Sequence, residues 1–256
     1  MRVNERAITQ FDHPLHIGDT VSIQVEKQAR ELAALPAGLR IVFEDDDIIV
    51  IDKPTGLLSI ANETEREATA YAHITEYLKL KRSRIPERAW IVHRLDRDTS
   101  GLMVLAKNEE AKVTLQTSWP AVTKRYLAIA EGTPKLATGT MRSHLDETNL
   151  MYVRSTVKGE DTREAITHYK VIKQHKGRNL FELTLETGRR HQIRVQLAEI
   201  GCPIIGDEKY GAQTNPAKRL GLHAFELTLP HPSTDEVMRF ESKLPPVLAS
   251  MFPERA

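Results

Sequence analysis

Hydrophobic and polar residues repeat along this chain with two different periods. Residues 178–188 (RNLFELTLETG) alternate, so that Phe181, Leu183 and Leu185 fall on one face, as in a strand with one buried side. Residues 66–80 (REATAYAHITEYLKL) instead place apolar side chains at helical spacing. The pattern therefore predicts a chain that uses both kinds of element.

Turn residues and breaks in these periods separate the other predicted elements. Asn108 can cap a helix that begins at residue 109, because its side chain can accept a hydrogen bond from the first turn. Gly201 and Pro203 end a helix that begins near residue 189. A short helix is also expected in residues 245–252. Further strands are expected in residues 39–44, 48–53, 89–92, 101–106, 124–132, 162–175, 222–232 and 237–242.

Adjoining strands that outnumber the helices predict an α+β fold, built on a mostly antiparallel mixed sheet with flanking helices. Residues 1–27 hold two short strands around a turn-rich middle, which is too little to fold alone. Residues 28–37 have a helical composition and are expected to form a linker. Residues 38–256 then form the main domain.

The composition is typical of a soluble globular protein. Of the 256 residues, 40% are hydrophobic, which is enough for a sizeable core. No apolar run approaches the roughly 18 residues of a membrane-spanning helix, and the N-terminus lacks a charged segment followed by an apolar one. We therefore expect a cytoplasmic protein without a membrane partner. Cys202 is the only cysteine, which excludes an internal disulfide, and we interpret it as a small buried hydrophobe.

The charges narrow the kind of partner. The 36 basic and 35 acidic residues nearly cancel, so any binding of nucleic acid has to come from local patches. One patch lies in residues 79–88 and includes Lys81, Arg82 and Arg84. A second runs through residues 175–194. Taken alone, each patch is more commonly a solvated face than a binding site.

One short segment carries candidate chemistry. Residues 90–108 (WIVHRLDRDTSGLMVLAKN) place Asp96 between Arg94 and Arg97 and follow it with a turn and an apolar run. The two arginines could simply hold Asp96 as a salt-bridged turn residue. The turn formers of residues 99–101, however, can fix the loop while the following strand anchors it. A carboxylate on a rigid loop beside basic residues suits a nucleophile or base that acts near phosphates.

Five stretches, in this order, resemble the motifs of the RluA-type pseudouridine synthases. The resemblance spans about residues 40–232. In that family the Asp after "HRL" is the catalytic residue. The stretches are IIVIDKPTGL (48–57), HRLDRDTSGLMVLAKN (93–108), KRYLA (124–128), LETGRRHQIRVQLAEIGCPIIGDEKYG (185–211) and LHAFELTLPHP (222–232).

The resemblance implies that the protein isomerises specific uridines to pseudouridine in structured RNA, which is ribosomal RNA, transfer RNA or both. This reaction breaks the bond between ribose C1′ and uracil N1, turns the base and rejoins the sugar to C5. It requires a carboxylate near C1′, a base for the C5 proton and a pocket for a base flipped out of the RNA. It uses no cofactor and no metal, in line with a chain that lacks a phosphate-binding glycine loop or a metal-ligand motif.

The family's roles transfer to matching residues. Asp96 is expected to act at the ribose, as a nucleophile or as a base. Tyr126 is expected to pack against the uracil and is a candidate to take the C5 proton. Arg194 is expected to pair with the carboxylate and keep it ionised. Arg94 is expected to enter the space that the flipped base leaves, where its planar guanidinium can stack on neighbouring bases.

Further residues are assigned more broadly. Lys53 and Pro54 are expected in the pocket wall. Arg189, His191 and Gln192 are expected either on the RNA side or in the scaffold of the site. The resemblance does not separate those two roles.

The chain departs from the family pattern at two kinds of place. Family members often carry His where this chain has Gln196, and a small residue where it has Arg190; we expect both differences to affect the RNA-binding surface. Residues 1–27 resemble the second half of an S4-type RNA-binding module without its helical first half. We expect them to be a remnant that packs on the main domain and adds little RNA affinity.

Two other functions remain open at this point. A catalytically inactive RNA-binding protein on the same scaffold would use the arginine-rich cleft as a clamp. A hydrolase would pair Asp96 with a second carboxylate, for which Asp98 and Asp207 are candidates. Without a long apolar patch, a monomer is expected. The target uridine depends on RNA shape, which the chain alone does not reveal.

Overall fold

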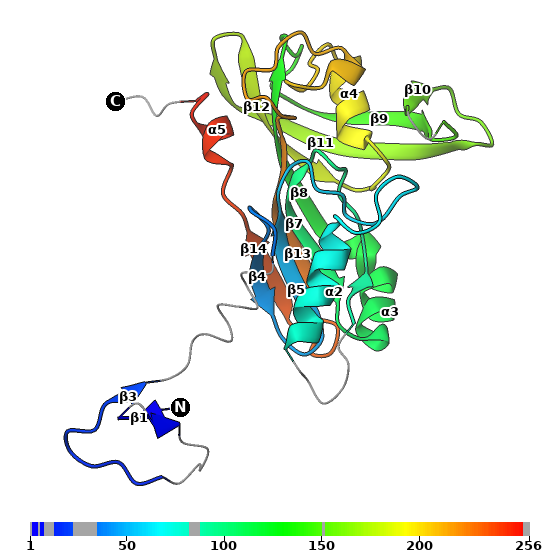
Figure 1. The fold of residues 1–256 in the computed structure, drawn as a ribbon. Helices are drawn as coiled ribbons and strands as arrows, with labels where there is room; N and C mark the ends of the chain where they lie inside the picture. Colours follow the sequence, from blue (N-terminus) through cyan, green and yellow to red (C-terminus); the bar gives the residue numbers. More distant parts are fainter. Residues whose placement is uncertain are drawn as a thin grey trace.

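The computed structural model describes residues 2–4, 6–7, 13–22, 35–81, 88–149 and 152–252. Within them, most strands join one 11-stranded sheet of order β10-β9-β11-β12-β8-β13-β7-β5-β4, in which β14 pairs with β13 and β6 with β7 (Figure 1). The strands are β4 (Arg40–Glu44), β5 (Ile48–Lys53), β6 (Trp90–Ile91), β7 (Ser100–Ala106), β8 (Thr123–Glu131), β9 (Thr138–Asp146), β10 (Arg154–Thr156), β11 (Thr162–His175), β12 (Arg178–Leu185), β13 (Leu222–Pro230) and β14 (Val237–Glu241).

Four α-helices and two 3₁₀ helices accompany the sheet in the described ranges. They are α2 (Ala70–Leu80), α3 (Glu109–Ser118), η1 (Trp119–Ala121), α4 (Gln192–Glu199), η2 (Glu208–Tyr210) and α5 (Pro246–Ala249). Among the described strand pairs of the large sheet, only β13 and β7 run parallel. The predicted α+β fold on a mostly antiparallel mixed sheet is therefore confirmed.

The centre of the sheet is covered on both faces. On β5, Ile49 and Ile51 belong to a core cluster with Ile74 of α2, while Ile48 and Val50 belong to a second cluster that includes helix α3. Because both faces are buried, every residue of β5 and of β7 is buried. This explains why these strands read as continuous apolar runs rather than as alternating ones.

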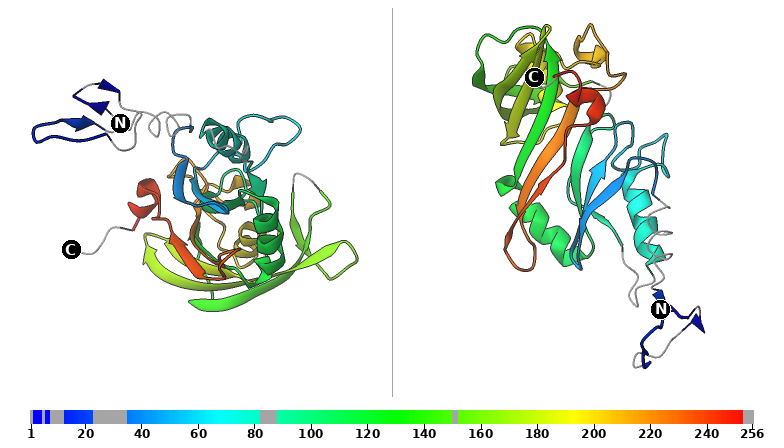
Figure 2. Two further views of the ribbon diagram at one scale, coloured as in Figure 1. Left: turned by 90° about the horizontal axis from the view of Figure 1, so that it is seen from below. Right: turned by 90° about the vertical axis from the view of Figure 1, so that its left-hand side faces the viewer.

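The other half of the sheet is covered by α4. Its Ile193 and Leu197 pack in one core cluster with Phe181, Leu183 and Leu185, the three residues predicted to share a face of β12. Figure 1 shows α4 beside β9, β11 and β12. Figure 2 shows the long yellow-green strands of this half curving along one side of the molecule. Helix α4 is thereby held next to the middle of the sheet, where β7, β8 and β13 meet.

Two strands have no counterpart in the sequence expectations. Strand β9 pairs with β11 over residues Thr138–Asp146, and β10 pairs with β9. Only Met141 and Leu145 of β9 are buried, so its apolar pattern is too sparse to indicate a strand. The long neighbour β11 supplies the backbone partners that hold it.

Glycine is required where β7 begins. Gly101 has a φ of +115°, and a Cβ atom at this position would lie 2.1 Å from the backbone oxygen of Ala224 on β13. A larger residue would force the two strands apart. The parallel contact of β7 with β13 thus depends on Gly101, five residues after Asp96.

Other expectations can be compared element by element. Asn108 caps α3 as predicted, since its side chain accepts a hydrogen bond of 2.8 Å from the Ala111 backbone N–H. The predicted helix in residues 245–252 is shorter, covering only Pro246–Ala249. None of the helices in the described ranges is long and apolar enough to cross a membrane.

The N-terminal residues form a sheet of their own. Instead of two strands there are three, β1 (Arg2–Val3), β2 (Arg6–Ala7) and β3 (Val21–Ser22), in the order β2-β1-β3. The prediction of two strands was therefore wrong, because a short β1–β2 hairpin went unseen. Most of the expected linker lies outside the described residues. The S4-like origin of this segment and the domain boundaries stay predictions.

Candidate active site

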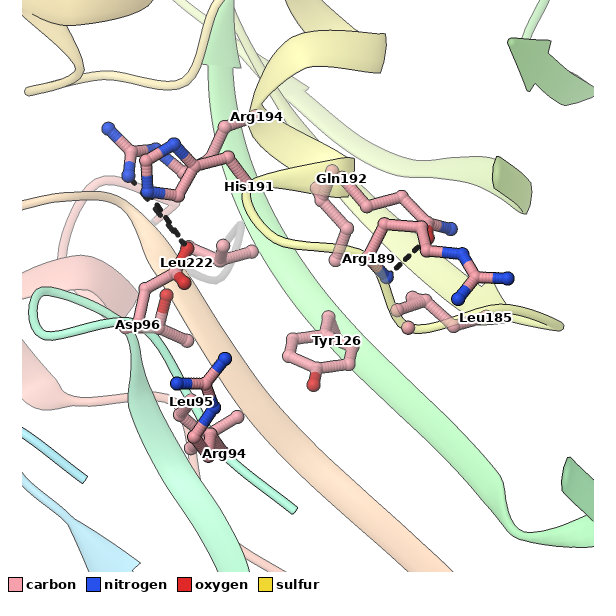
Figure 3. A pocket seen from close by; sticks show the side chains of 13 residues that line it. Arg94, Leu95, Asp96, Tyr126, Leu185, Arg189, His191, Gln192, Arg194 and Leu222 are labelled. Carbon is pink, nitrogen blue, oxygen red and sulfur yellow. Dashed lines mark hydrogen bonds and ion pairs between the residues drawn. The ribbon is translucent and has the colours of Figure 1, made fainter. Parts of the chain in front are cut away.

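A cavity of about 90 Å³ lies between the loop that precedes β7 and the turn that begins α4, and it opens into a larger cleft (Figure 3). Strands β8 and β12 contribute to its wall between these two segments. The structure brings together seven of the residues singled out from the sequence: Arg94, Asp96, Tyr126, Arg189, His191, Gln192 and Arg194.

The loop that carries Asp96 is fastened on the side away from the cavity. Ser59 Oγ donates a hydrogen bond of 2.7 Å to the backbone oxygen of Leu95 and accepts one of 3.0 Å from its N–H. Thr55 Oγ1 donates to the backbone oxygen of Asp98 at 2.8 Å. These bonds hold the backbone on both sides of Asp96 and leave its side chain directed into the cavity.

Lys53 holds the same loop from the interior of the protein. Its side chain is fully buried, and its Nζ donates to the backbone oxygens of Pro54, Leu57 and Arg97 at 3.0, 2.7 and 3.1 Å. Burial lowers the pKa of Lys53 to about 7, against the opposing charges of Asp96 and Asp98. Three carbonyl acceptors match the three N–H bonds of the ammonium form.

The expectation that Lys53 and Pro54 line the pocket is therefore not met. Neither residue contributes to the wall of the cavity or of the larger cleft. Lys53 ends a strand whose other residues are all buried, and its long side chain continues along this interior. It supports the Asp96 loop from behind.

The Asp96 carboxylate lies near a positive charge, at a distance too long for a hydrogen bond. Its side chain is 26% exposed, with Oδ2 lying 3.8 Å from Arg194 Nη1 and 4.0 Å from His191 Nε2. No described residue donates a hydrogen bond to this carboxylate. Burial raises the pKa of Asp96, while the charges of Arg194, Lys53 and Arg94 act in the opposite direction.

Arg194 has a closer partner than the one expected. Its Nε and Nη2 donate to the two carboxylate oxygens of Asp207, both at 2.7 Å. Asp207 has a side chain that is only 1% exposed. Arg194 therefore faces Asp96 with its charge, and its geometry is set by the bidentate pair with Asp207.

Tyr126 and Arg94 both line the cavity. Figure 3 shows the Tyr126 ring between the Asp96 loop and the α4 turn, with Arg94 beside it. Burial and the charge of Asp96 raise the pKa of Tyr126 well above its ordinary value, so its phenol is neutral. Arg94 is exposed, and no described residue accepts a hydrogen bond from its guanidinium. It is available to a ligand.

The sequence left Arg189, His191 and Gln192 between an RNA-side and a scaffold position, and in the structure the three residues have different surroundings. His191 lies in the cavity wall near Asp96, with its Nδ1 2.7 Å from the Tyr210 hydroxyl. Gln192 is buried and accepts hydrogen bonds from the Thr187 hydroxyl and the Arg189 N–H, which places it in the scaffold. Arg189 is exposed at the cavity rim, and its Nε donates to the backbone oxygen of Glu164.

The two departures from the family pattern, Gln196 and Arg190, both hold neighbouring segments through hydrogen bonds. Gln196 is fully buried, accepts from the Thr167 hydroxyl at 2.7 Å and donates to the Ala165 backbone oxygen at 3.0 Å. Arg190 bonds the segment after β9 through the side chain and backbone oxygen of Glu147. Gln196 joins α4 to its sheet, whereas Arg190 also lines the larger cleft, so the expected effect on the RNA surface stays a prediction.

The basic patch of residues 79–88 is only partly described. Lys81 follows α2, and its Nζ donates to Glu44 at 2.8 Å, outside the walls of the cavity and of the cleft. Arg82 and Arg84 lie outside the described residues. An RNA-binding role for these three residues stays a prediction.

The structure adds site residues that the sequence reasoning missed or assigned differently. Ser59 and Tyr210 had not been singled out, because Ser59 stands in a loop and Tyr210 in the short helix η2, and neither segment has a periodic pattern. Asp207 had been considered as the second carboxylate of a hydrolase. Both of its oxygens are engaged by Arg194, which makes it a structural partner instead.

Known proteins share this sequence and this fold. The family model for RNA pseudouridylate synthases matches residues 47–199. An RNA pseudouridine synthase of Bacillus subtilis is 35% identical over 257 residues, covering 97% of this chain and 83% of its own. Ribosomal large subunit pseudouridine synthase D of Nitrosomonas europaea is 37% identical over 237 residues, covering 88% and 67%.

A solved structure shows the same fold. The human protein RNA pseudouridylate synthase domain containing 4 superposes with a TM-score of 0.70 at 24% identity, covering 88% of this chain and 94% of its own. This match shows the fold, and the sequence matches define the class as RNA-modifying isomerases. The chain belongs to the RNA pseudouridylate synthase family, and the resemblance to its RluA-type members is confirmed. It is an RNA pseudouridine synthase.

Proposed function

We propose that the protein converts specific uridines of structured RNA to pseudouridine with Asp96 as the catalytic carboxylate. The observation that carries this proposal is the environment of Asp96. The carboxylate faces a cavity from a fastened loop and lies near the charge of Arg194, yet its oxygens accept no hydrogen bond from the described residues. Its lone pairs are therefore free to act on a substrate.

The charges around Asp96 serve either mechanism at the ribose. As a nucleophile it attacks C1′, and as a base it removes a proton from the sugar; both require the ionised carboxylate. The guanidinium of Arg194 and the ammonium of Lys53 favour that form against the effect of burial. In either route the C1′–N1 bond breaks and the uracil turns. C5 then bonds to C1′, as the carboxylate leaves C1′ in the first route or as the sugar proton is returned in the second, while C5 loses its proton and N1 gains one.

Tyr126 and Arg94 receive different tasks. Because the phenol of Tyr126 stays protonated, we assign it to packing against the uracil rather than to accepting the C5 proton. Arg94 is exposed and has no acceptor among the described residues, so it can enter the space that a flipped uridine leaves and stack on the neighbouring bases.

Ribosomal RNA is the substrate class that the relatives favour. Several of them are named ribosomal large subunit pseudouridine synthase D, and their matches cover most of this chain. We therefore propose a monomeric cytoplasmic enzyme acting on ribosomal RNA, with transfer RNA as the second substrate to test. A binding protein without activity is disfavoured, because a carboxylate in an RNA cleft repels phosphate and weakens binding.

Release of tritium from C5 of uracil tests this function directly. Ribosomal and transfer RNA transcripts labelled at that position are incubated with wild type, with Asp96→Asn and with Asp98→Asn. Wild type and Asp98→Asn should release label to water, while Asp96→Asn should bind the RNA without releasing it. Release by Asp96→Asn would contradict its assignment, and binding without release by any variant would support the non-catalytic alternative.

A further inference from the structure

Two ring nitrogens of His191 face two different partners in the site. Nε2 lies 4.0 Å from Oδ2 of Asp96, and Nδ1 lies 2.7 Å from the hydroxyl oxygen of Tyr210. The side chain is only 13% exposed. His191 precedes α4 with a φ of +54°, and it lines the cavity. The position of each nitrogen is thus fixed by the fold.

The hydrogen bonds of Tyr210 determine which nitrogen of His191 carries the hydrogen. The backbone N–H of Val153 donates to the Tyr210 hydroxyl oxygen at 3.1 Å. The phenol hydrogen then needs an acceptor, and His191 Nδ1 is the one that the described residues offer. An accepting Nδ1 leaves the single ring hydrogen of a neutral imidazole on Nε2.

The opposite tautomer would make two unfavourable contacts. A hydrogen on Nδ1 would leave the phenol hydrogen of Tyr210 without an acceptor in a residue that is 7% exposed. It would also direct the lone pair of Nε2 at the Asp96 carboxylate. Burial, followed by the charges of Arg194, Lys209 and Arg190, lowers the pKa of His191 to about 3, which keeps the ring neutral.

We propose that Tyr210 and His191 are a pair of positioning residues, in which the Tyr210 hydroxyl holds the N–H of His191 Nε2 toward Asp96. This proposal rests on the proposed function of Asp96 and extends it. The partial positive charge of the N–H orients the carboxylate without protonating it, and the 4.0 Å separation leaves both carboxylate oxygens free for the substrate.

Tyr210 is itself held in place and contacts both groups that face Asp96. Its ring lies 4.9 Å from the Arg194 guanidinium and stacks on the Tyr152 ring, with centroids 5.1 Å apart. Tyr210 thereby contacts the segment before β10 through Val153 and Tyr152. It also contacts His191 and Arg194, the two groups beside the carboxylate. Removing only its hydroxyl should leave this packing intact.

Nitrogen NMR of histidine-labelled protein tests the tautomer without reference to activity. With ¹⁵N in the imidazole rings, the signals of His191 are identified by their loss in His191→Asn. We expect a protonated Nε2 and an unprotonated Nδ1 in wild type and in Tyr152→Phe, and a mixture of tautomers in Tyr210→Phe. A protonated Nδ1 in wild type, or an unchanged His191 signal in Tyr210→Phe, would overturn the proposal.

Kinetics of tritium release test the positioning role. Tyr210→Phe should lower kcat by about tenfold to a hundredfold, as expected for a misplaced reactive group, with KM for RNA changed less than about twofold. Tyr152→Phe should match wild type. His191→Gln, which can direct an amide N–H toward Asp96, should retain more activity than His191→Asn, which tolerates the same backbone conformation but is too short.

The outcomes separate the two proposals. If Asp96→Asn still releases label, the proposed function of Asp96 fails, whatever the tautomer of His191. If Asp96→Asn is inactive but Tyr210→Phe keeps the wild-type kcat, only the positioning role fails. Equal loss of folding stability and activity in Tyr210→Phe, with an unchanged tautomer, would also count against it.

Discussion

Asp96 and Asp207 both face Arg194, but the two segments that carry them are built differently. Asp207 has a side chain that is 1% exposed and binds the guanidinium through two hydrogen bonds of 2.7 Å. Asp96 is 26% exposed and lies 3.8 Å from the same guanidinium without a hydrogen bond. The protein engages both oxygens of one carboxylate, whereas the other accepts no hydrogen bond from the described residues.

This difference shows how Arg194 can have a structural role and an electrostatic role at the same time. The bidentate pair fixes the guanidinium plane, because two parallel hydrogen bonds permit little rotation. The charge then acts on Asp96 through space, where it favours ionisation without occupying the oxygens. The fastening of the Asp96 loop by Ser59 and Lys53 supplies the rigidity that Asp96 does not obtain from its own side chain.

The largest effect on stability should come from the Asp207 carboxylate. Asp207→Asn should lower the free energy of unfolding by about 3–5 kcal/mol, because it leaves the buried charge of Arg194 without its partner. Asp96→Asn should keep or raise stability at neutral pH, since burial raises the pKa of Asp96 and its ionisation above that pKa costs folding free energy. Urea denaturation measures the free energy of unfolding of the two variants. An equal loss in both would contradict the difference proposed between the two carboxylates.

Removing the support behind the loop should have the next largest effect. Lys53→Met should lower the free energy of unfolding by about 2–3 kcal/mol, because three interior carbonyl groups lose their donor. It should also raise the pKa of Asp96 further, so that activity on the acid side is lost at a higher pH. Urea denaturation and the pH dependence of kcat measure these changes. The exposed control Lys170→Met should alter neither quantity.

Acid should weaken the same loop through His93. Its Nε2 accepts a hydrogen bond of 3.1 Å from the Val104 N–H, and burial lowers its pKa to about 3 from an ordinary 6.5. Below pH 6.5, His93 binds a proton in the unfolded chain but stays unprotonated in the folded protein. The free energy of unfolding therefore falls by about 1.4 kcal/mol per pH unit through this group, until the pH nears 3.

His93→Gln tests that contribution, because its amide oxygen can still accept from Val104. Denaturation midpoints between pH 7.5 and pH 5 should fall less steeply for His93→Gln than for wild type. The exposed control His16→Gln should follow wild type. Parallel curves for all three proteins would contradict the role given to His93.

The smallest effect should come from outside the site. Asn108→Ala removes the cap of α3 and the hydrogen bond from Asn108 to Asp47, and it should lower stability by about 1 kcal/mol. Asn108→Ser, which keeps an acceptor at the helix start and places no charge beside Asp47, should restore part of this loss. Turnover should stay at the wild-type value in both. A fall in kcat would show that α3 contributes to the site.

Much of the fold could be predicted because its signals are local. The shared face of Phe181, Leu183 and Leu185 and the cap at Asn108 follow from the periods and stereochemistry of a single element. Strand β9 could not be predicted from its own pattern, because only two of its residues are buried and its pairing comes from β11.

For the site, the sequence motifs were enough to identify the family, the candidate carboxylate and most of the residues around it. The contacts of these residues follow from the packing of the fold: Lys53 lies behind the loop, Asp207 accepts the hydrogen bonds of Arg194, and Tyr210 contacts His191. Periodicity reports which face of an element is buried. Whether an arginine far along the chain meets one carboxylate or two depends on distances of an ångström, which only the packing of the sheet and α4 sets.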